Sequence, residues 1–143
     1  MAQQTPLRVL VVSDHTAATP ELLAAIRQRA ARGEAQFRVL VPNPAHAEIQ
    51  LLHPGRHAKA LAAELMFLEA QPLFEEAAGG PVIGSISIRH RPHDAVEELM
   101  LGEAVDEIIV DGFTHSHLRW LHPDVAHRLA HFGLPITKVE HSP

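Results

Sequence analysis

Short apolar runs alternate with helix-forming stretches along the chain, and this alternation constrains the fold more than any other feature. The runs are rich in β-branched residues and contain few polar ones, as in strands that are buried on both faces of a parallel sheet. Strands are predicted at residues 7–12, 37–41, 82–88, 106–110 and 136–139. Helices are predicted between them, at residues 20–32, 58–78, 92–101 and 123–132.

The first predicted helix has clear start and stop signals. Thr19 offers a capping hydroxyl, Pro20 suits the first helical position, and Glu21 complements the helix dipole. Gly33 then ends the helix, because glycine readily adopts the conformation found after helix C-termini. These signals support the helix boundaries independently of the apolar pattern.

The second predicted helix is the longest. It places Leu61, Leu65 and Leu68 on one face at helical spacing. Pro72 lies inside it and removes a backbone donor, so we expect a kink or a new turn at this position.

The alternation predicts one α/β domain that spans residues 1–143. We expect a single doubly wound, Rossmann-like domain with a five-stranded parallel sheet and helices on both faces. In open sheets of this kind, ligands bind beyond the carboxyl ends of the strands, where the strand order reverses. The loops after the first, second and fourth strands are therefore the regions in which to look for a site.

Composition excludes several classes of site and partner. The chain has no cysteine, which rules out disulfides, thiolate metal ligands and a cysteine nucleophile. The formal net charge is −5 without a basic stripe, so we expect no nucleic-acid partner. We identify no signal peptide and no apolar run of about 20 residues, and we therefore expect a cytoplasmic protein without a membrane span.

Two stretches resemble the universal stress protein family. The opening stretch VLVVSDHTAATPELLAAI is similar to the family's first strand, aspartate-containing turn and first helix. The stretch DEIIVDGFTHSHLRWLHPDVAHRLAHFGLPITKV is similar to the family's last strand–loop–helix–strand unit, in particular that of short, divergent, actinobacterial-like members. The resemblance implies the strand order 3-2-1-4-5, with a switch point between the first and fourth strands. It also implies a non-catalytic role in stress response or regulation.

The phosphate-binding loop of the family's ATP-binding members is altered in this chain. That loop reads G-x2-G-x9-G-[ST], and only its first glycine is retained, as Gly112. His115 replaces the second glycine, while Pro123 and Asp124 replace the final pair. Proline has no N–H to donate, and a carboxylate at about 4 Å from a phosphate oxygen repels it by about 4 kcal/mol at an effective dielectric near 20. We therefore expect triphosphate binding in the family's usual mode to be lost or weakened.

The resemblance still implies a ligand site at the switch point. Asp14 matches the aspartate that lies on the adenine side of the site in ATP-binding members, and an adenine nucleoside, an adenine nucleotide or another small polar ligand therefore remains a candidate. The predicted ligand-binding residues are Ser13, Asp14, His15, Val41, Gly112, His115, Ser116 and Arg119. Asp14 is equally suited to a structural role, since aspartate often binds backbone amides in turns.

Two other functions stay open at this point. His15, His115 and His117 provide ligand types that zinc prefers, which would suit a metal-dependent or histidine-based enzyme. No helical metal-ligand spacing and no nucleophile elbow is present, so we expect a protein that is not an enzyme and holds no metal. Ordinary ATP binding despite the altered loop is the other alternative.

The last predicted strand suggests a homodimer. In the order 3-2-1-4-5 this strand lies at a sheet edge, and an apolar edge invites pairing with another chain. The resemblance implies a two-fold homodimer through residues 136–140. Lys138 and Glu140 would alternatively act as charged residues that keep the edge monomeric.

Overall fold

The structure, a computed structural model, describes residues 6–14, 18–42, 56–87, 92–111 and 125–139. Its strands are β1 (Leu7–Ser13), β2 (Ala35–Pro42), β3 (Val82–Ser87), β4 (Glu107–Asp111) and β5 (Ile136–Lys138). Its helices are α1 (Pro20–Ala31), α2 (Arg56–Ala78), α3 (Pro92–Gly102), α4 (Val125–Leu129) and the short 3₁₀ helix η1 (Ala130–Phe132). Every predicted strand and helix is present, with boundaries that differ by a few residues.

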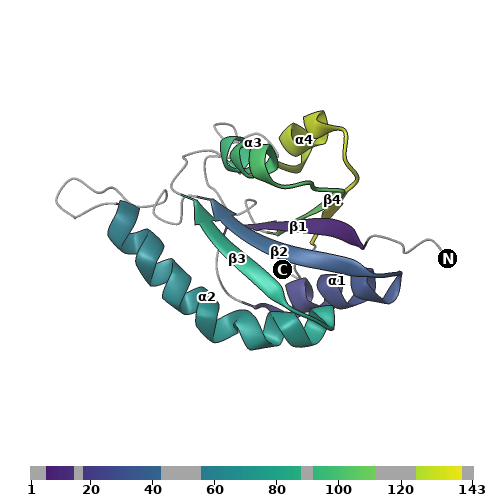
Figure 1. Cartoon of the computed structure of the whole chain (residues 1–143), viewed down its shortest axis with the longest axis horizontal. Coiled ribbons are helices and arrows are strands. Elements are labelled where there is room, and N and C mark those ends of the chain that lie inside the picture. The colour runs from purple at the N-terminus through teal and green to yellow at the C-terminus, as the bar shows by residue number, and fades with distance from the viewer. Residues whose placement is uncertain (1–5, 15–17, 43–55, 88–91, 112–124, 140–143) are drawn as a thin grey trace.

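The five strands form one parallel sheet in the order β3-β2-β1-β4-β5 (Figure 1). This arrangement confirms the predicted fold class and strand order. β1 lies at the centre and pairs with β2 on one side and β4 on the other, with Val11 opposite both Val39 and Ile109. The strand order reverses between β1 and β4, so the switch point lies where it was expected.

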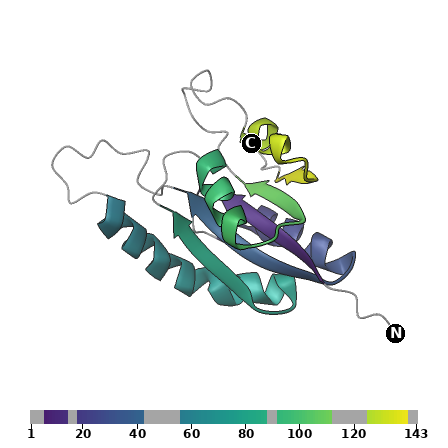
Figure 2. The same ribbon diagram turned by 45° about the horizontal axis from the view of Figure 1, so that its top comes forward.

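Helices cover both faces of the sheet, with α1 and α2 on one side and α3 and α4 on the other (Figures 1 and 2). We call these the α1/α2 face and the α3/α4 face. The core of the α1/α2 face contains Val9, Val11, Leu22, Ile26, Phe37, Val39, Val41, Phe67, Phe74, Ala77, Val82 and Ile109. The core of the α3/α4 face is smaller and contains Leu10, Val12, Leu40, Ala95, Val96, Ile108, Val110 and Leu129. In β1, β2 and β4, alternate residues enter opposite cores, as the period of a strand requires.

The predicted cap of α1 is formed. The Leu22 N–H donates to the Thr19 hydroxyl oxygen at 3.2 Å, and Pro20 occupies the first turn. The chain turns into β2 at Gly33, whose φ of +151° is one that residues with a side chain rarely adopt.

α2 differs from the sequence prediction in the face that it buries. Leu61, Leu65 and Leu68 do share a face, but each is almost 60% exposed. The buried face carries the rings of Phe67 and Phe74, which stack with centroids 5.6 Å apart. Aromatic rings bury more area than leucine side chains, and this explains why the aromatic face packs on the sheet.

The approach of α2 to the sheet depends on a glycine. The Phe67 ring lies over Gly84 of β3, and a Cβ at Gly84 would come within 2.3 Å of this ring. Gly84 therefore provides the space into which Phe67 packs. α2 continues through Pro72 as a single helix, so the proline does not begin a new element there.

Two arginine–glutamate pairs tie the outer elements to the sheet. On the α1/α2 face, Arg29 Nε donates to Glu107 Oε1 at 2.6 Å, and the two side chains are only 7% and 13% exposed. On the α3/α4 face, Arg38 Nη2 donates to Glu103 Oε1, and these side chains are 23% and 36% exposed. The two pairs thus have the same chemistry in different surroundings.

The C-terminal region differs from its prediction in detail. The helix expected at residues 123–132 is described from Val125 and changes to 3₁₀ geometry at Ala130, while Gly133 ends it with a φ of +76°. β5 is shorter than predicted and ends at Lys138. Among the described residues, no helix combines the length and the apolarity that crossing a membrane requires.

Candidate functional site

The carboxyl ends of β1 and β4 meet at the switch point and bring three polar residues together. Ser13 lies directly opposite Asp111 in the sheet register. The Asp14 N–H donates to the Asp111 carbonyl at 3.2 Å, which holds the turn after β1 against the end of β4. Ser13 and Asp111 are fully buried, and Asp14 is half-buried.

The local sequence explains why polar residues lie at this place. The runs Val9–Val12 and Ile108–Val110 are buried on both faces, and each ends in a polar residue. Because β1 and β4 are parallel and paired, both runs end at the same edge of the sheet. Ser13 and Asp14 are thus placed at the predicted site, and Asp111 joins them.

The chemistry of this cluster is that of hydrogen-bond acceptors. An ionised carboxylate has two acceptor oxygens, and a serine hydroxyl both donates and accepts. Asp14 and Asp111 also take part in further interactions with other residues. Of the three residues, only the half-buried Asp14 is accessible to a ligand; its carboxylate suits hydroxyl or amine donors and is electrostatically unfavourable for phosphate groups.

Val41 was predicted to contact a ligand and lies at the end of β2. Its side chain is fully buried in the core of the α1/α2 face, together with Val9 and Val11. Only its backbone is therefore in a position to meet a ligand at the carboxyl edge of the sheet.

The remaining predicted site residues lie outside the described part of the chain. These residues are His15, Gly112, His115, Ser116 and Arg119, together with the altered loop positions Pro123 and Asp124. The alternative metal site of His15, His115 and His117 also lies there. Among the residues that are described, no group of three or more histidine, aspartate and glutamate side chains is arranged to hold a metal ion.

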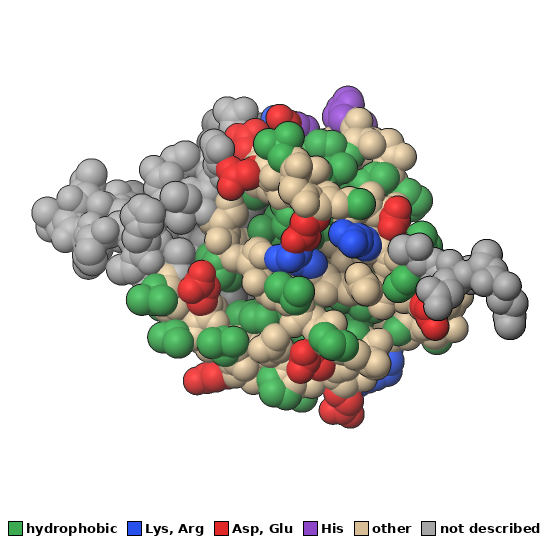
Figure 3. All heavy atoms as spheres, viewed as in Figure 1, with side chains coloured by type: hydrophobic (Ala, Val, Ile, Leu, Met, Phe, Trp, Pro, Cys, Tyr) green, Lys and Arg blue, Asp and Glu red, His purple; other side chains and the backbone are tan. Residues whose placement is uncertain are grey.

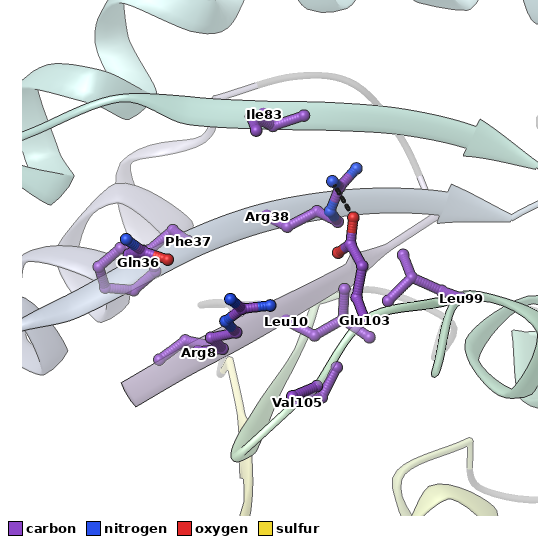
Figure 4. Close-up of a pocket in the computed structure, with 11 residues that line it drawn as sticks. Arg8, Leu10, Gln36, Phe37, Arg38, Ile83, Leu99, Glu103 and Val105 are labelled. Atoms are coloured by element: carbon purple, nitrogen blue, oxygen red, sulfur yellow. Dashed lines mark hydrogen bonds and ion pairs between the residues drawn. The ribbon is translucent and has the colours of Figure 1, made fainter. Parts of the chain in front are cut away.

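Sequence reasoning missed a second polar cluster, on the α3/α4 face. Arg38 projects from the middle of β2, and its Nη1 donates to the Ser85 hydroxyl at 2.6 Å while Nη2 donates to Glu103. Arg38 and Glu103 line a hollow of about 260 Å³ between the sheet and the turn after α3 (Figure 4), and all three residues line a second hollow beside it. The signal in the sequence was a cation inside a strand that otherwise reads as buried on both faces.

Comparison with known proteins identifies solved structures that have the same fold. No protein-family model matches the chain, and no curated protein matches it significantly in sequence. A crystal structure of a universal stress protein in complex with cAMP superposes with a TM-score of 0.60 at 16% identity, over 96% of this chain and 100% of that one.

A second solved structure agrees with the first. The universal stress protein from Archaeoglobus fulgidus superposes with a TM-score of 0.60 at 13% identity, over 94% of this chain and 95% of that one. In strand order, helix placement and extent, the chain has the fold of the universal stress proteins.

Proposed function

We propose that the chain is a non-catalytic binding domain, used in stress response or regulation, that takes the nucleoside part of an adenine nucleotide at the β1/β4 switch point. The observation that carries the proposal is the cluster of Ser13, Asp14 and Asp111 at the carboxyl ends of the two paired strands. Ligands of doubly wound sheets bind at this position. A protein with the same fold is in complex with cAMP, which contains adenosine and a single phosphate.

The charge of the cluster favours a nucleoside over a triphosphate. The Asp14 carboxylate is half-buried and offers charge-assisted hydrogen bonds to ribose hydroxyls. The same carboxylate repels the several negative charges of a triphosphate. In the sequence, Pro123 removes an amide that would donate to phosphate, and Asp124 adds a carboxylate where phosphate oxygens would lie. Adenosine and AMP are therefore the expected ligands, and ATP is expected to bind no more tightly than they do.

Calorimetric titration with adenosine, AMP, cAMP and ATP tests this proposal. Asp14→Ala is expected to weaken adenosine binding about tenfold, because a hydrogen bond to a charged group contributes about 1.5–3 kcal/mol. Asp94→Ala removes an exposed aspartate from α3 and serves as the control, with no expected effect. ATP binding more than tenfold tighter than adenosine, or an Asp14→Ala variant with unchanged affinity, would contradict the proposal.

The proposal further places the domain in the cytoplasm as a homodimer that pairs through residues 136–140. β5 is an edge strand, and Thr137 and Lys138 are exposed on it. Unpaired backbone groups on such an edge favour addition of a strand from a second copy. Light scattering at micromolar concentration should give the mass of a dimer, and Lys138→Pro, which removes an amide that points away from β4, should reduce it to that of a monomer. A monomeric mass for the unmodified chain would refute the dimer.

A further inference from the structure

The α3/α4 face leaves part of the sheet uncovered. Its core takes residues from β1 and β4 but only Leu40 from β2, whereas β2 and β3 otherwise present Gln36, Arg38, Ile83 and Ser85 on this side. Ile83 is 56% exposed although it lies on a strand of the sheet. Figure 3 shows a hollow near the middle of this face, with basic and acidic side chains gathered in it.

Two connected hollows form a groove here, which we call the α3 groove. The first has a volume of about 260 Å³ and lies toward the amino ends of the strands. The second, of about 450 Å³, lies toward their carboxyl ends. They share Arg38, Leu99 and Glu103, so the groove is continuous along α3. Small-molecule sites are typically about 300–1,000 Å³, so the first hollow, at about 260 Å³, suits only a compact ligand.

The first hollow contains two guanidinium groups on neighbouring strands. Arg38 is held in place by Ser85 and Glu103. Arg8 projects from β1 on the same face and is exposed; within the described part of the chain, its guanidinium forms no ion pair. Figure 4 shows both side chains at the hollow, with Glu103 beside Arg38.

The charges at this end of the groove favour an anion. Of the residues that line the first hollow, Arg8 and Arg38 are cationic and Glu103 alone is anionic. The nearby Asp106 carboxylate accepts the backbone N–H of Arg8 at 2.7 Å and does not line the hollow. Because Glu103 is already paired with Arg38, Arg8 is the cation that a ligand would meet.

Apart from Gln36, the rest of the hollow is lined by apolar side chains. Ile83 borders it from β3, and the half-buried Leu99 and Val105 border it from α3 and the turn before β4. Burial of a ligand's apolar body against these side chains would stabilise the complex by about 25 cal/mol for each Å² removed from water. A ligand that fits both regions has one negative charge and a compact apolar body.

We propose that the α3 groove is a second ligand site, separate from the switch point, that binds a small carboxylate with an apolar body. The carboxylate pairs with Arg8, whose planar guanidinium matches carboxylate geometry. The apolar body packs on Ile83, Leu99 and Val105. The Arg38–Glu103 pair forms one wall and keeps its structural role.

Titration of the full chain with benzoate, followed by amide NMR, tests this site residue by residue. Benzoate is expected to shift the amide signals of Ile83, Leu99 and Val105. Arg8→Gln is expected to weaken binding about tenfold, as the loss of a charged hydrogen bond predicts. Arg27→Gln makes the same change at an exposed arginine of α1 and should leave the affinity unchanged.

Matched probes separate the charge from the apolar body. Benzyl alcohol has a similar ring without a charge, and inorganic phosphate has a charge without a ring. Both are expected to bind at least tenfold more weakly than benzoate. Equal binding of either probe, no shifts in the groove, or an Arg8→Gln variant with unchanged affinity would overturn the proposal. Adenosine is not expected to shift these amides, so failure at the switch point remains distinguishable from failure here.

Discussion

The two arginine–glutamate pairs occupy opposite faces of the same sheet in different environments. Arg29 and Glu107 are closed in by α1 and are at most 13% exposed, whereas Arg38 and Glu103 border an open groove and are 23% and 36% exposed. Water can solvate the charges of Arg38 and Glu103, but it has little access to those of Arg29 and Glu107. One pair is therefore expected to be essential for stability, while the other leaves its face open to ligands.

The two faces of the sheet also differ in how completely the helices cover them. The α1/α2 face is closed by aromatic side chains, and Phe67 and Phe74 are both at most 4% exposed. On the α3/α4 face, the helices leave part of β2 and β3 uncovered, and polar side chains occupy this part of the sheet. Substitutions on the two faces should therefore have unequal effects, and four of them test this difference in order of expected size.

Phe74→Ala should cause the largest loss. It removes a ring that is 1% exposed, and such truncations cost about 3–5 kcal/mol of unfolding free energy. Leu73→Ala on the same helix is the control, because Leu73 is 49% exposed and should cost less than about 1 kcal/mol. Urea denaturation measures both. Similar losses for the two variants would mean that α2 is not packed as described.

Arg29→Met should come next, at about 3 kcal/mol, because it removes the close partner of the buried Glu107 carboxylate and leaves only the exposed Arg32 side chain, at 3.9 Å. The double variant Arg29→Met/Glu107→Met should recover most of this loss, since no buried charge remains. Thermal and urea unfolding of the single and double variants measure the recovery. A double variant that is less stable than Arg29→Met would argue against this explanation.

Gly84→Ala should destabilise the chain by about 2 kcal/mol, because the added Cβ overlaps the Phe67 ring. Phe67→Leu should make room for this methyl group. In a double-mutant cycle, the combined loss should be smaller than the sum of the single losses. Strict additivity would show that Phe67 does not rest on Gly84.

Arg38→Met should have the smallest effect, about 1 kcal/mol or less, because solvent reaches both members of its pair. If Arg38→Met lost as much unfolding free energy as Arg29→Met, the two ion pairs would not differ in the way their exposure predicts. Circular dichroism during urea unfolding measures both variants under the same conditions.

The sheet was predictable from the sequence because each strand carries its own signal. The β-branched run at Val9–Val12 identifies a buried parallel strand from its composition alone, and the resemblance supplied the strand order. Ser13 and Asp14 were placed at the switch point because they directly follow this run. These features depend on residues that are adjacent in the chain.

The orientation of α2 was not predictable in this way. Its leucine stripe and its aromatic stripe are both apolar, and the choice between them depends on Gly84, which is remote in sequence from Phe67. The Arg38–Ser85–Glu103 cluster likewise unites three separate segments. Periodicity within one segment contains no information about such partners.

The position of β1 has a consequence for how the chain is made on the ribosome. β1 is the central strand, yet its pairing with β4 joins residues that are 98 positions apart, as in the contact between Arg8 and Asp106. At synthesis rates of about 5–20 residues per second, β4 is made about 5–20 seconds after β1, and the edge of β1 that pairs with β4 stays unpaired for that time. During this interval the β4-facing edge of an apolar strand stays unpaired in the nascent chain, and such an edge is prone to pair with other chains.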